Sequence, residues 1–330
     1  MKLLLKGWEA EDRQALLRRR LTTGWEIDAW DSAAGDDALA AALAEADAMV
    51  TMYYTSDTPA APRLRLLQLP GAGFEGIDFD AVPPACAVCN VFEHEGSIAE
   101  YVLAAMLEWV TGLSRMHARL RKGDWGDSLL VGGPLHGELA GKTVGIIGYG
   151  HIGREVARRA RAFDVRVIAV TRSPIKRDEN VDRIAGPDGL DALLGEADFV
   201  VVSCPLTPET RGLIDAARLA KMKAGGVLIN VARGAVVDED ALYEACRDRT
   251  IGGAVIDVWY NYPEAGSTSP VFPSKHPFHE LDNVYMTPHA AAWTEGLHER
   301  RWSVIAENLD RLAKGEPLLN LLRAPREPRP

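Results

Sequence analysis

Arg233 and His289 are the two side chains whose types and positions best suit chemistry. Each follows a run that predicts a buried strand, at 227–231 for Arg233 and at 284–286 for His289. The carboxyl ends of parallel strands in a doubly wound sheet meet at one ligand crevice. A guanidinium there can bind a carboxylate or polarise a carbonyl, and an imidazole can transfer a proton. The pair suits reduction of a 2-oxo acid, although singly they would indicate an ion pair and a helix cap.

A glycine-rich turn precedes both residues. Gly148, Gly150 and Gly153 form G-x-G-x-x-G between a β-branched run at 143–147 and a segment of helical spacing, and 165–170 predicts the next strand. The first glycine allows a tight turn, the second lets the backbone approach a pyrophosphate, and the third lets helix pack on strand. The glycines alone are as typical of an empty turn, but the complete βαβ unit favours a dinucleotide site.

The end of this βαβ unit indicates which dinucleotide it binds. Eighteen residues after Gly153, where a carboxylate would meet the ribose hydroxyls of NAD, the chain has Thr171-Arg172-Ser173, with Lys176 and Arg177 beyond. Without that carboxylate a 2′-phosphate is not repelled, and a guanidinium and a hydroxyl can bind it. We therefore expect NADP(H) to be preferred, with NAD(H) possible if Arg172 stacks on adenine instead.

Composition narrows the class of protein. The length of 330 residues favours two domains. Nearly half of the residues are hydrophobic, which is typical of globular proteins. Its formal net charge of -10 disfavours nucleic acid or an anionic membrane as a partner. The apolar run Leu3-Leu4-Leu5 is too short for a signal peptide, and we see no membrane span. We expect a cytoplasmic protein whose partner is a small molecule.

The four cysteines do not predict a disulfide framework. Cys86 and Cys89 form C-x-x-C, but they lie in an alternating apolar run that predicts a strand. Residues three apart in a strand point to opposite faces. We therefore expect buried thiols rather than a zinc or redox pair, and we expect no metal site.

The elements that must position these residues alternate between strand and helix along both halves of the chain. This alternation predicts an α/β protein with two doubly wound, Rossmann-like parallel sheets. A long helix is expected from Ser97, as N-cap with Glu100 in a capping box, to about Met116, and a frayed tail after about Lys314. The predicted strands are 3–6, 25–30, 48–52, 64–69, 85–91, 143–147, 165–170, 199–203, 227–231, 253–258 and 284–286.

Taken together, the motifs resemble those of the D-2-hydroxyacid dehydrogenases, relatives of phosphoglycerate, glyoxylate/hydroxypyruvate and formate dehydrogenases. The resemblance covers nearly the whole chain and is specific for the family rather than for a substrate. Its dense part comprises 138–143, 148–153, 205–210, 230–238 and 287–289, and its looser part comprises 71–78, Asn90 and 98–100.

The resemblance implies a discontinuous substrate domain, 1–95 with 294–330, an NAD(P)-binding domain, 96–293, a cleft between them, and usually a homodimer. It implies that Arg233 binds substrate, that His289 is the acid/base and that Asp257 holds the nicotinamide carboxamide. Substrate contacts are expected from Tyr53, Gly73, Phe74, Asn90, Arg233 and His289. Cofactor contacts are expected from Gly148, Gly150, His151, Ile152, Gly153, Thr171, Arg172, Ser173, Cys204, Pro205, Thr210, Val231, Ala232, Arg233, Asp257 and His289.

Tyr262 departs from the family pattern. The family usually has a glutamate at this position, before a proline, and its carboxylate keeps the pKa of the histidine high. A phenol supports an imidazolium less well, although Glu264 lies nearby in sequence. Two alternatives follow: a dehydrogenase that needs no proton relay, as in formate oxidation, and a dinucleotide-binding regulator resembling a co-repressor. The function that we expect first remains a hydride transfer between NADP(H) and a 2-oxo or D-2-hydroxy acid. The catalytic residues expected for it are Arg233, His289 and Tyr262.

Overall fold

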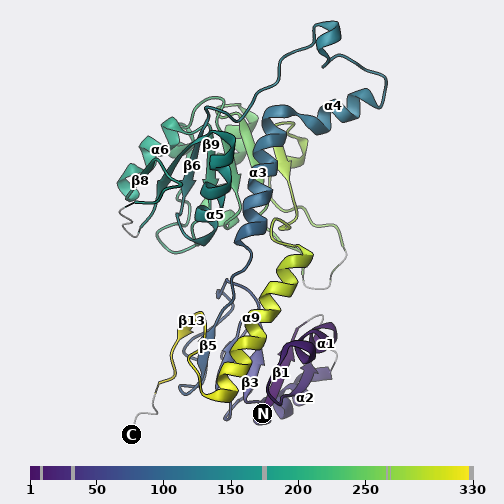
Figure 1. The fold of residues 1–330 in the computed structure, drawn as a ribbon, viewed down its shortest axis with the longest axis vertical. Helices are drawn as coiled ribbons and strands as arrows, with labels where there is room; N and C mark the ends of the chain where they lie inside the picture. Colours follow the sequence, from purple (N-terminus) through teal and green to yellow (C-terminus); the bar gives the residue numbers. More distant parts are fainter. Residues whose placement is uncertain (8–9, 31–33, 173–176, 265–266, 268, 327–330) are drawn as a thin grey trace. The chain divides into compact units, whose positions relative to one another are not determined.

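The structure is a computed structural model that describes residues 1–7, 10–30, 34–172, 177–264, 267 and 269–326. The chain forms two compact units, and the chain passes from the first to the second and back. Unit 1 is Met1–Glu93 with Thr294–Pro330, and unit 2 is His94–Trp293 (Figure 1). Each unit contains an α/β sheet, as the alternating sequence pattern predicts.

Unit 2 is built on a parallel sheet in the order β12-β11-β10-β9-β6-β7-β8. The order reverses between β6 and β9, which is where a doubly wound sheet binds its ligand, outside the carboxyl ends of the strands. Its strands are β6 (Thr143–Ile147), β7 (Arg166–Val170), β8 (Arg183–Ala185), β9 (Phe199–Val202), β10 (Val227–Asn230), β11 (Gly253–Ile256) and β12 (Val284–Met286).

The central strands of unit 2 are buried on both faces, so they read as continuous apolar runs. Two cores lie on the two sides of this sheet, and α3 packs with α5 in one of them. A short edge strand, β8, was not predicted, because its three residues are only partly buried and lack an apolar run. The helices are α3 (Glu95–Thr111), α4 (Leu113–Leu120), α5 (His151–Ala160), α6 (Leu190–Glu196), α7 (Ala216–Leu219) and α8 (Glu239–Arg247).

The single long helix predicted from Ser97 to Met116 is two helices. It begins at Glu95, so Ser97 is a buried residue inside α3 rather than its N-cap. Gly112 ends α3 in the left-handed conformation, with φ of 65°, and α4 starts in a new direction. Glycine takes this conformation without the strain that a Cβ adds, so one glycine splits an otherwise helical pattern.

Unit 1 has a sheet in the order β13-β5-β4-β3-β1-β2, parallel except for β13. Its helices are α1 (Ala10–Arg20) and α2 (Gly35–Glu45) from the first segment and α9 (Glu295–Lys314) from the last. The last segment thus completes the fold of the first. The strands are β1 (Lys2–Lys6), β2 (Glu26–Trp30), β3 (Ala48–Val50), β4 (Leu66–Gln68), β5 (Ala87–Cys89) and β13 (Leu321–Arg323).

The expectation of a frayed tail is wrong at β13. This strand pairs with β5, and the Arg323 guanidinium donates to the carbonyls of Phe79, Val82, Pro83 and Cys86 at 2.6–3.1 Å. The anchor is one side chain binding carbonyls about 240 residues away, and hydropathy patterns do not report such a contact.

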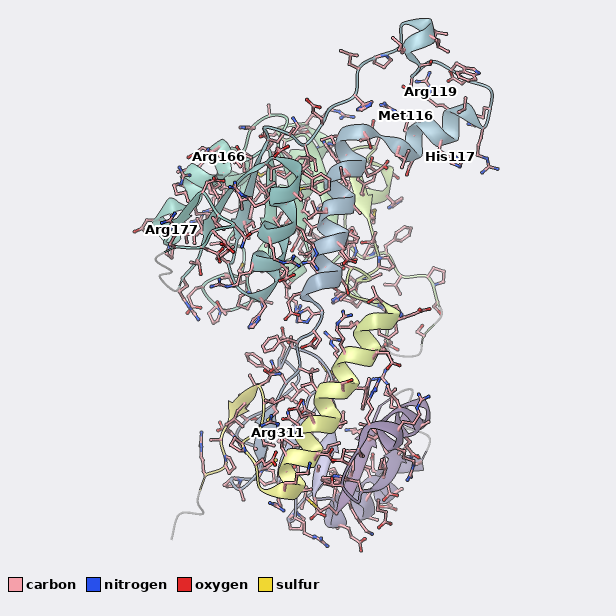
Figure 2. The ribbon with its side chains drawn as sticks, viewed as in Figure 1. Met116, His117, Arg119, Arg166, Arg177 and Arg311 are labelled. Atoms are coloured by element: carbon pink, nitrogen blue, oxygen red, sulfur yellow. The ribbon has the colours of Figure 1, made fainter. Side chains whose placement is uncertain are left out.

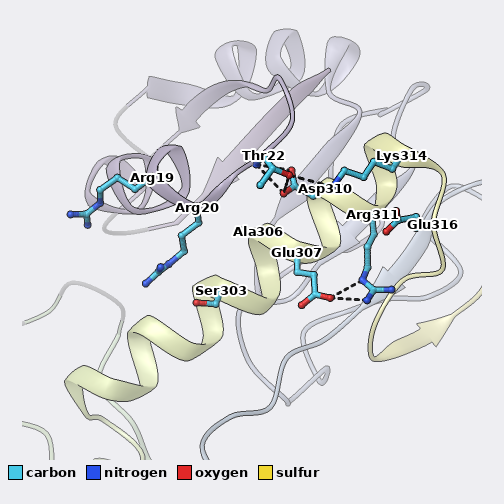
Figure 3. A pocket seen from close by; sticks show the side chains of 10 residues that line it. All are labelled: Arg19, Arg20, Thr22, Ser303, Ala306, Glu307, Asp310, Arg311, Lys314 and Glu316. Atoms are coloured by element: carbon cyan, nitrogen blue, oxygen red, sulfur yellow. Dashed lines mark hydrogen bonds and ion pairs between the residues drawn. The ribbon is translucent and has the colours of Figure 1, made fainter.

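Asp310 ties α9 to the turn after α1. Its carboxylate is buried and accepts hydrogen bonds from the backbone N–H groups and hydroxyls of Thr22 and Thr23 at 2.5–3.2 Å (Figure 3). A cavity of about 540 Å³ lies along the same groove. Glu307 on its wall forms an ion pair with Arg311.

The two cysteines of C-x-x-C pack on opposite sides of the unit 1 sheet, as predicted. Cys86 belongs to one core cluster and Cys89 to the other. Burial raises the pKa of each thiol to about 12, so both are neutral small hydrophobes at physiological pH. Among the described residues, no helix has both the length and the apolar character to cross a membrane.

Candidate active site

The glycines of 148–153 follow β6 and lead into α5, at the sheet's switch point. Gly148 has φ of 96°, and a Cβ on it would lie 2.5 Å from the backbone nitrogen of Cys204. A Cβ on Gly153 would lie 2.6 Å from the carbonyl oxygen of Gly148. Gly148 and Gly153 are therefore required by the fold itself, for the turn and for helix–strand packing.

Gly150 differs, because a Cβ on it would meet no atom of the described residues within 4 Å. The fold does not need a glycine there, whereas a ligand that approaches the backbone would. Gly150 is also the N-cap of α5 and has no side chain to cap the helix, so the first N–H groups of α5 have their positive ends exposed. These features fit a dinucleotide pyrophosphate. Ile152 packs into the core, and His151 is exposed.

The loop after β9 closes over the glycine turn. Ser203 donates its hydroxyl to the Gly148 carbonyl at 2.9 Å, and Cys204 lies buried against Gly148. Thr210 holds the loop in shape, since its hydroxyl donates to the Pro205 carbonyl at 2.6 Å and accepts from the Thr207 N–H at 2.7 Å. Of the predicted residues, Cys204 thus lies at the glycine turn, while Pro205 and Thr210 are joined to each other within the loop.

The end of β7 carries Thr171 and Arg172. Arg172 is exposed, and Ser173 and Lys176 lie outside the described residues. A hydrogen bond from Thr207 lowers the pKa of Glu209, and the charge of Arg172 contributes in the same direction. Arg172 is therefore close enough to the 205–210 loop for its charge to be felt there.

Arg154 braces the next part of the same edge. Its guanidinium lies 5.0 Å from the Tyr149 ring and donates to Asp178 at 2.8 Å. Asp178 in turn accepts the N–H of Asn180 at 3.0 Å. Arg154 thereby ties the segment after β7 to the glycine turn.

Arg233 stands on a rigid turn after β10. Asn230 is buried, its amide donates to the Arg233 carbonyl at 3.1 Å, and its oxygen accepts the Ala232 N–H at 3.1 Å. A Cβ on Gly234 would lie 2.3 Å from the Trp259 carbonyl oxygen, so this turn packs directly on the segment after β11. Val231 and Ala232 are buried in the same turn, which leaves the half-buried Arg233 as its ionic side chain.

Asp257 holds the loop that carries His289. One carboxylate oxygen accepts the Thr287 hydroxyl at 2.6 Å and the Ala290 N–H at 2.8 Å, and the other accepts the Ala291 N–H at 3.0 Å. Asp257 is only 2 % exposed. His289 itself has φ of 57°, an uncommon conformation for a residue with a side chain, which the surrounding bonds maintain. The expected contact of Asp257 with nicotinamide stays a prediction, beside this positioning role.

Tyr262 reaches His289. The Tyr262 hydroxyl lies 3.1 Å from His289 Nδ1 and accepts the backbone N–H of Trp259 at 3.0 Å. The tyrosine therefore stands at the nitrogen that a glutamate usually serves in the family.

The pKa of His289 lies below its ordinary value. Neighbouring protein removes water from around the ring, the positive charge of Arg233 acts in the same direction, and the negative charge of Asp257 opposes both. Loss of water also raises the pKa of Tyr262, so its phenol is neutral at physiological pH. At pH 7 the site thus contains a cationic Arg233, a mainly neutral imidazole and a neutral phenol.

The predicted substrate residues of unit 1 follow three neighbouring parallel strands at their carboxyl ends. Tyr53 comes after β3, Gly73 and Phe74 after β4, and Asn90 directly after β5. The buried Asn90 donates its amide to the Ala72 carbonyl at 2.9 Å, which holds the Gly73–Phe74 turn. Tyr53 and Phe74 are 67 % and 49 % exposed, so aromatic surface is available to a ligand.

Sequence reasoning did not foresee the contacts of Tyr101 and Trp259 with Thr287, which hold the His289 loop. The Thr287 hydroxyl gives its one hydrogen to Asp257, so it accepts the Tyr101 hydroxyl of α3 at 2.7 Å, and the Thr287 carbonyl accepts the Trp259 indole N–H at 2.8 Å. No spacing rule joins a helix residue to a loop 186 positions away. Thr287 alone had a signal, as it begins the Thr287-Pro288-His289 motif.

Comparison with known proteins shows which family the chain resembles in sequence. Residues 103–291 match the family model described as "D-isomer specific 2-hydroxyacid dehydrogenase, NAD binding domain". The chain is 32% identical to the D-3-phosphoglycerate dehydrogenase of Methanocaldococcus jannaschii, over 87% of this chain and 53% of that protein. It is 32% identical to the glyoxylate reductase of Pyrococcus horikoshii, over 90% of each.

A solved structure with the same architecture is that of the NADPH-dependent glyoxylate/hydroxypyruvate reductase of Sinorhizobium meliloti, in complex with NADP and sulfate. It superposes with a TM-score of 0.79 at 26% identity, covering 97% of this chain and 98% of that one. The chain spans about half the length of the curated phosphoglycerate dehydrogenases that it matches.

Proposed function

Because the chain belongs to the D-isomer specific 2-hydroxyacid dehydrogenase family, we propose that it catalyses NAD(P)-dependent interconversion of a 2-oxo acid and a D-2-hydroxy acid. The observation that carries this proposal is the group around His289. Its loop is held by the buried Asp257, its Nδ1 meets Tyr262, and the charge of Arg233 acts on it. An imidazole with fixed orientation beside a guanidinium suits proton transfer on a carboxylate-bearing substrate.

When bound, the nicotinamide supplies the hydride and accepts it back. Arg233 binds the substrate carboxylate or carbonyl and stabilises the negative charge that develops on the carbonyl oxygen during reduction. His289 transfers the proton to and from that oxygen. Asp257 keeps the imidazole in place, because all three groups it binds belong to residues 287–291.

NADP(H) is the preferred cofactor in this proposal. The support is the sequence Thr171-Arg172 at the end of β7, where no carboxylate opposes a 2′-phosphate and the Arg172 guanidinium is exposed. Comparing kcat/KM for NADPH and NADH with one substrate tests the preference. A higher kcat/KM with NADH would reject it.

A panel of 2-oxo acids assayed with NADPH and with NADH, with reduced nicotinamide followed by absorbance, tests the function. Turnover of any member supports the enzyme and excludes a protein that only senses the dinucleotide. Formate with NAD⁺ and NADP⁺ belongs in the same panel, since its oxidation requires no proton relay. Turnover of formate alone would replace the proposal with that chemistry.

A homodimer belongs to the proposal as well. The segment from α4 to residue 137 projects from the body of unit 2, and Figure 2 marks Met116, His117 and Arg119 along α4. Exposed apolar patches of this kind mark association surfaces. A second copy of this chain fits as the occupant, because this segment exposes seven large hydrophobic side chains at 50–100 %, namely Leu113, Leu120, Trp125, Leu129, Leu130, Val131 and Leu135.

Light scattering on the full chain measures the assembly directly. We expect twice the chain mass of 35.9 kDa for the natural protein. The double variant Leu129→Asp, Leu135→Asp should be a monomer, whereas Phe272→Asp, exposed outside this segment, should remain a dimer. A natural protein that is a monomer at all concentrations would reject the dimer.

A further inference from the structure

The Tyr262 hydroxyl has one hydrogen and two polar neighbours. The Trp259 backbone N–H can only donate, so at 3.0 Å the phenol oxygen must accept from it. The hydroxyl hydrogen is then available for His289 Nδ1, 3.1 Å away. Both contacts are satisfied together when Tyr262 donates to Nδ1.

This arrangement determines where neutral His289 carries its proton. An Nδ1 that accepts a hydrogen bond bears no hydrogen, so the proton is on Nε2. The opposite tautomer, with hydrogen on Nδ1, would make the phenol oxygen accept twice and leave its own hydrogen without this partner. A carboxylate in place of Tyr262 can only accept, and it would therefore favour hydrogen on Nδ1.

We propose that Tyr262 holds His289 as the Nε2–H tautomer and is the proton relay behind it during reduction of the 2-oxo acid. Tyr262 is a positioning residue in this scheme, because it acts on the substrate through His289. The inference rests on the proposed reductase function and adds the source and path of the proton.

The protons balance across two hydrogen bonds. Both protons move in the step in which the carbonyl carbon receives the hydride and negative charge develops on its oxygen. The Nε2–H bond of His289 breaks as the new O–H bond forms, and the Tyr262 O–H bond breaks as Nδ1 gains its hydrogen. His289 ends neutral in the other tautomer and Tyr262 ends as a phenolate, which takes a proton from water because 47 % of the residue is exposed.

Loss of water around Tyr262 disfavours a transient phenolate most, and two neighbouring groups oppose this effect. The Trp259 N–H donates to the oxygen on which the charge develops. Arg233, after β10, lowers the pKa of Tyr262, whereas Asp257, after β11, raises it, and loss of water raises it most. Tyr101 of α3 bonds Thr287 rather than the phenol. The alkoxide of a 2-hydroxy acid is a stronger base than a phenolate, so the transfer runs toward product.

The relay separates the reaction from the need for an imidazolium. A histidine paired with a carboxylate must first be protonated, so reduction slows about tenfold per pH unit above its pKa. With the relay, the neutral Nε2–H form is the reactive one. Reduction by the natural protein should therefore stay level from about pH 6.5 to 9, although the pKa of His289 is low.

The tautomer can be measured without any substrate. Nitrogen-15 NMR of the histidine side chains, with His289 assigned by comparison with His289→Gln, reports which ring nitrogen carries hydrogen. We expect Nε2–H in the natural protein at pH 8 and Nδ1–H in Tyr262→Glu. An Nδ1–H tautomer in the natural protein would overturn the inference, whatever the enzyme turns over.

Kinetics of three proteins test the relay, using the natural chain, Tyr262→Phe and Tyr262→Glu. Above the pKa of His289, kcat for reduction should fall about tenfold per pH unit in Tyr262→Phe, and in Tyr262→Glu it should fall only from a higher pH. Phe keeps the ring and removes only the hydroxyl, so a purely structural role would lower kcat equally at every pH. A level profile in Tyr262→Phe would therefore reject the relay.

Mixed H₂O/D₂O solvents count the protons that move. With hydride transfer made rate-limiting, as checked by a primary isotope effect from deuterated NADPH, the rate should curve with deuterium fraction in the natural protein. It should be linear in Tyr262→Glu, where one proton moves. Linear behaviour in the natural protein rejects the relay while leaving the reductase intact, whereas absence of turnover with every 2-oxo acid rejects the reductase itself.

Discussion

Both units have parallel strands whose carboxyl ends lie at one edge of the sheet, but the residues at this edge differ in chemical type between the two units. In unit 2 that edge holds Arg233, Asp257 and His289, joined to their surroundings by hydrogen bonds from side chains and backbone. In unit 1 the predicted substrate residues are the neutral Tyr53, Gly73, Phe74 and Asn90. Proton transfer needs titratable groups in fixed positions, whereas recognition needs shape and neutral hydrogen bonds.

The glycine-rich loops of the two units, 148–153 and 71–76, also differ in their surroundings. The loop at 148–153 runs directly into α5, so it combines a tight turn with the positive end of a helix. The loop at 71–76 is followed by turns and no helix, and it is held by the Asn90 amide. A similar glycine content therefore gives a turn that starts a helix in one unit and a turn held by a side-chain amide in the other.

The largest effect should come from His289. His289→Gln removes proton transfer and should lower kcat by about 10²–10⁴-fold with a folded protein. His279→Gln, an exposed histidine of unit 2, is the matched control and should keep its activity. Steady-state kinetics with circular dichroism measures both. Near-normal kcat in His289→Gln would show that the chemical step does not depend on His289, and the assignment of the chemistry to unit 2 would be wrong.

The glycines of 148–153 should separate folding from cofactor binding. Gly150→Ala places its Cβ where no atom of the part of the chain that the structure describes lies within 4 Å, so stability should change by less than about 0.5 kcal/mol while NADPH binds at least about tenfold more weakly. Gly148→Ala combines a positive φ with a 2.5 Å contact and should cost about 1–3 kcal/mol of folding free energy. Thermal unfolding measures the stability and fluorescence titration measures the NADPH affinity. Unchanged NADPH affinity in Gly150→Ala would show that the pyrophosphate does not bind beside Gly150.

The unit 1 edge should affect binding more than the chemical step. Asn90→Ala releases the turn that carries Gly73 and Phe74, because the bond to the Ala72 carbonyl is lost. We expect KM for the 2-oxo acid to rise about tenfold, the equivalent of one lost hydrogen bond, with kcat within about threefold. If instead kcat fell as far as in His289→Gln, the division of roles between the edges would be wrong.

The smallest effect concerns a carboxylate of unit 1 that serves the fold. Burial alone would raise the pKa of Asp310, but its hydrogen bonds from Thr22 and Thr23 outweigh burial and lower it. A lowered carboxyl pKa stabilises the fold above the unfolded pKa of about 3.9, and this stability is lost as pH falls through the folded pKa. Asp310→Asn should cost about 1 kcal/mol at pH 7 and less at pH 3, which lies below the unfolded pKa. Urea unfolding at both pH values measures this, and an equal loss at both would contradict it.

Local patterns in the sequence were enough to predict the α/β architecture and the positions of the buried strands. Continuous apolar runs predict buried parallel strands because such strands are covered on both faces, and the runs at β6, β9, β10 and β11 are buried throughout. The same logic places Arg233 and His289 after strands, and it places the glycines between β6 and α5. Glycine positions are readable because Gly148 requires a backbone conformation that other residues avoid.

Short elements and long-range bonds were decided by tertiary structure. The strand β13 and the split at Gly112 depend on one arginine and one backbone angle, neither of which leaves a periodic signal. Tyr262 at His289 Nδ1, and Tyr101 and Trp259 at Thr287, are contacts between segments that meet only when the sheet is assembled. Local patterns record which faces are buried, but a hydrogen bond between distant side chains depends on where the completed fold brings their atoms.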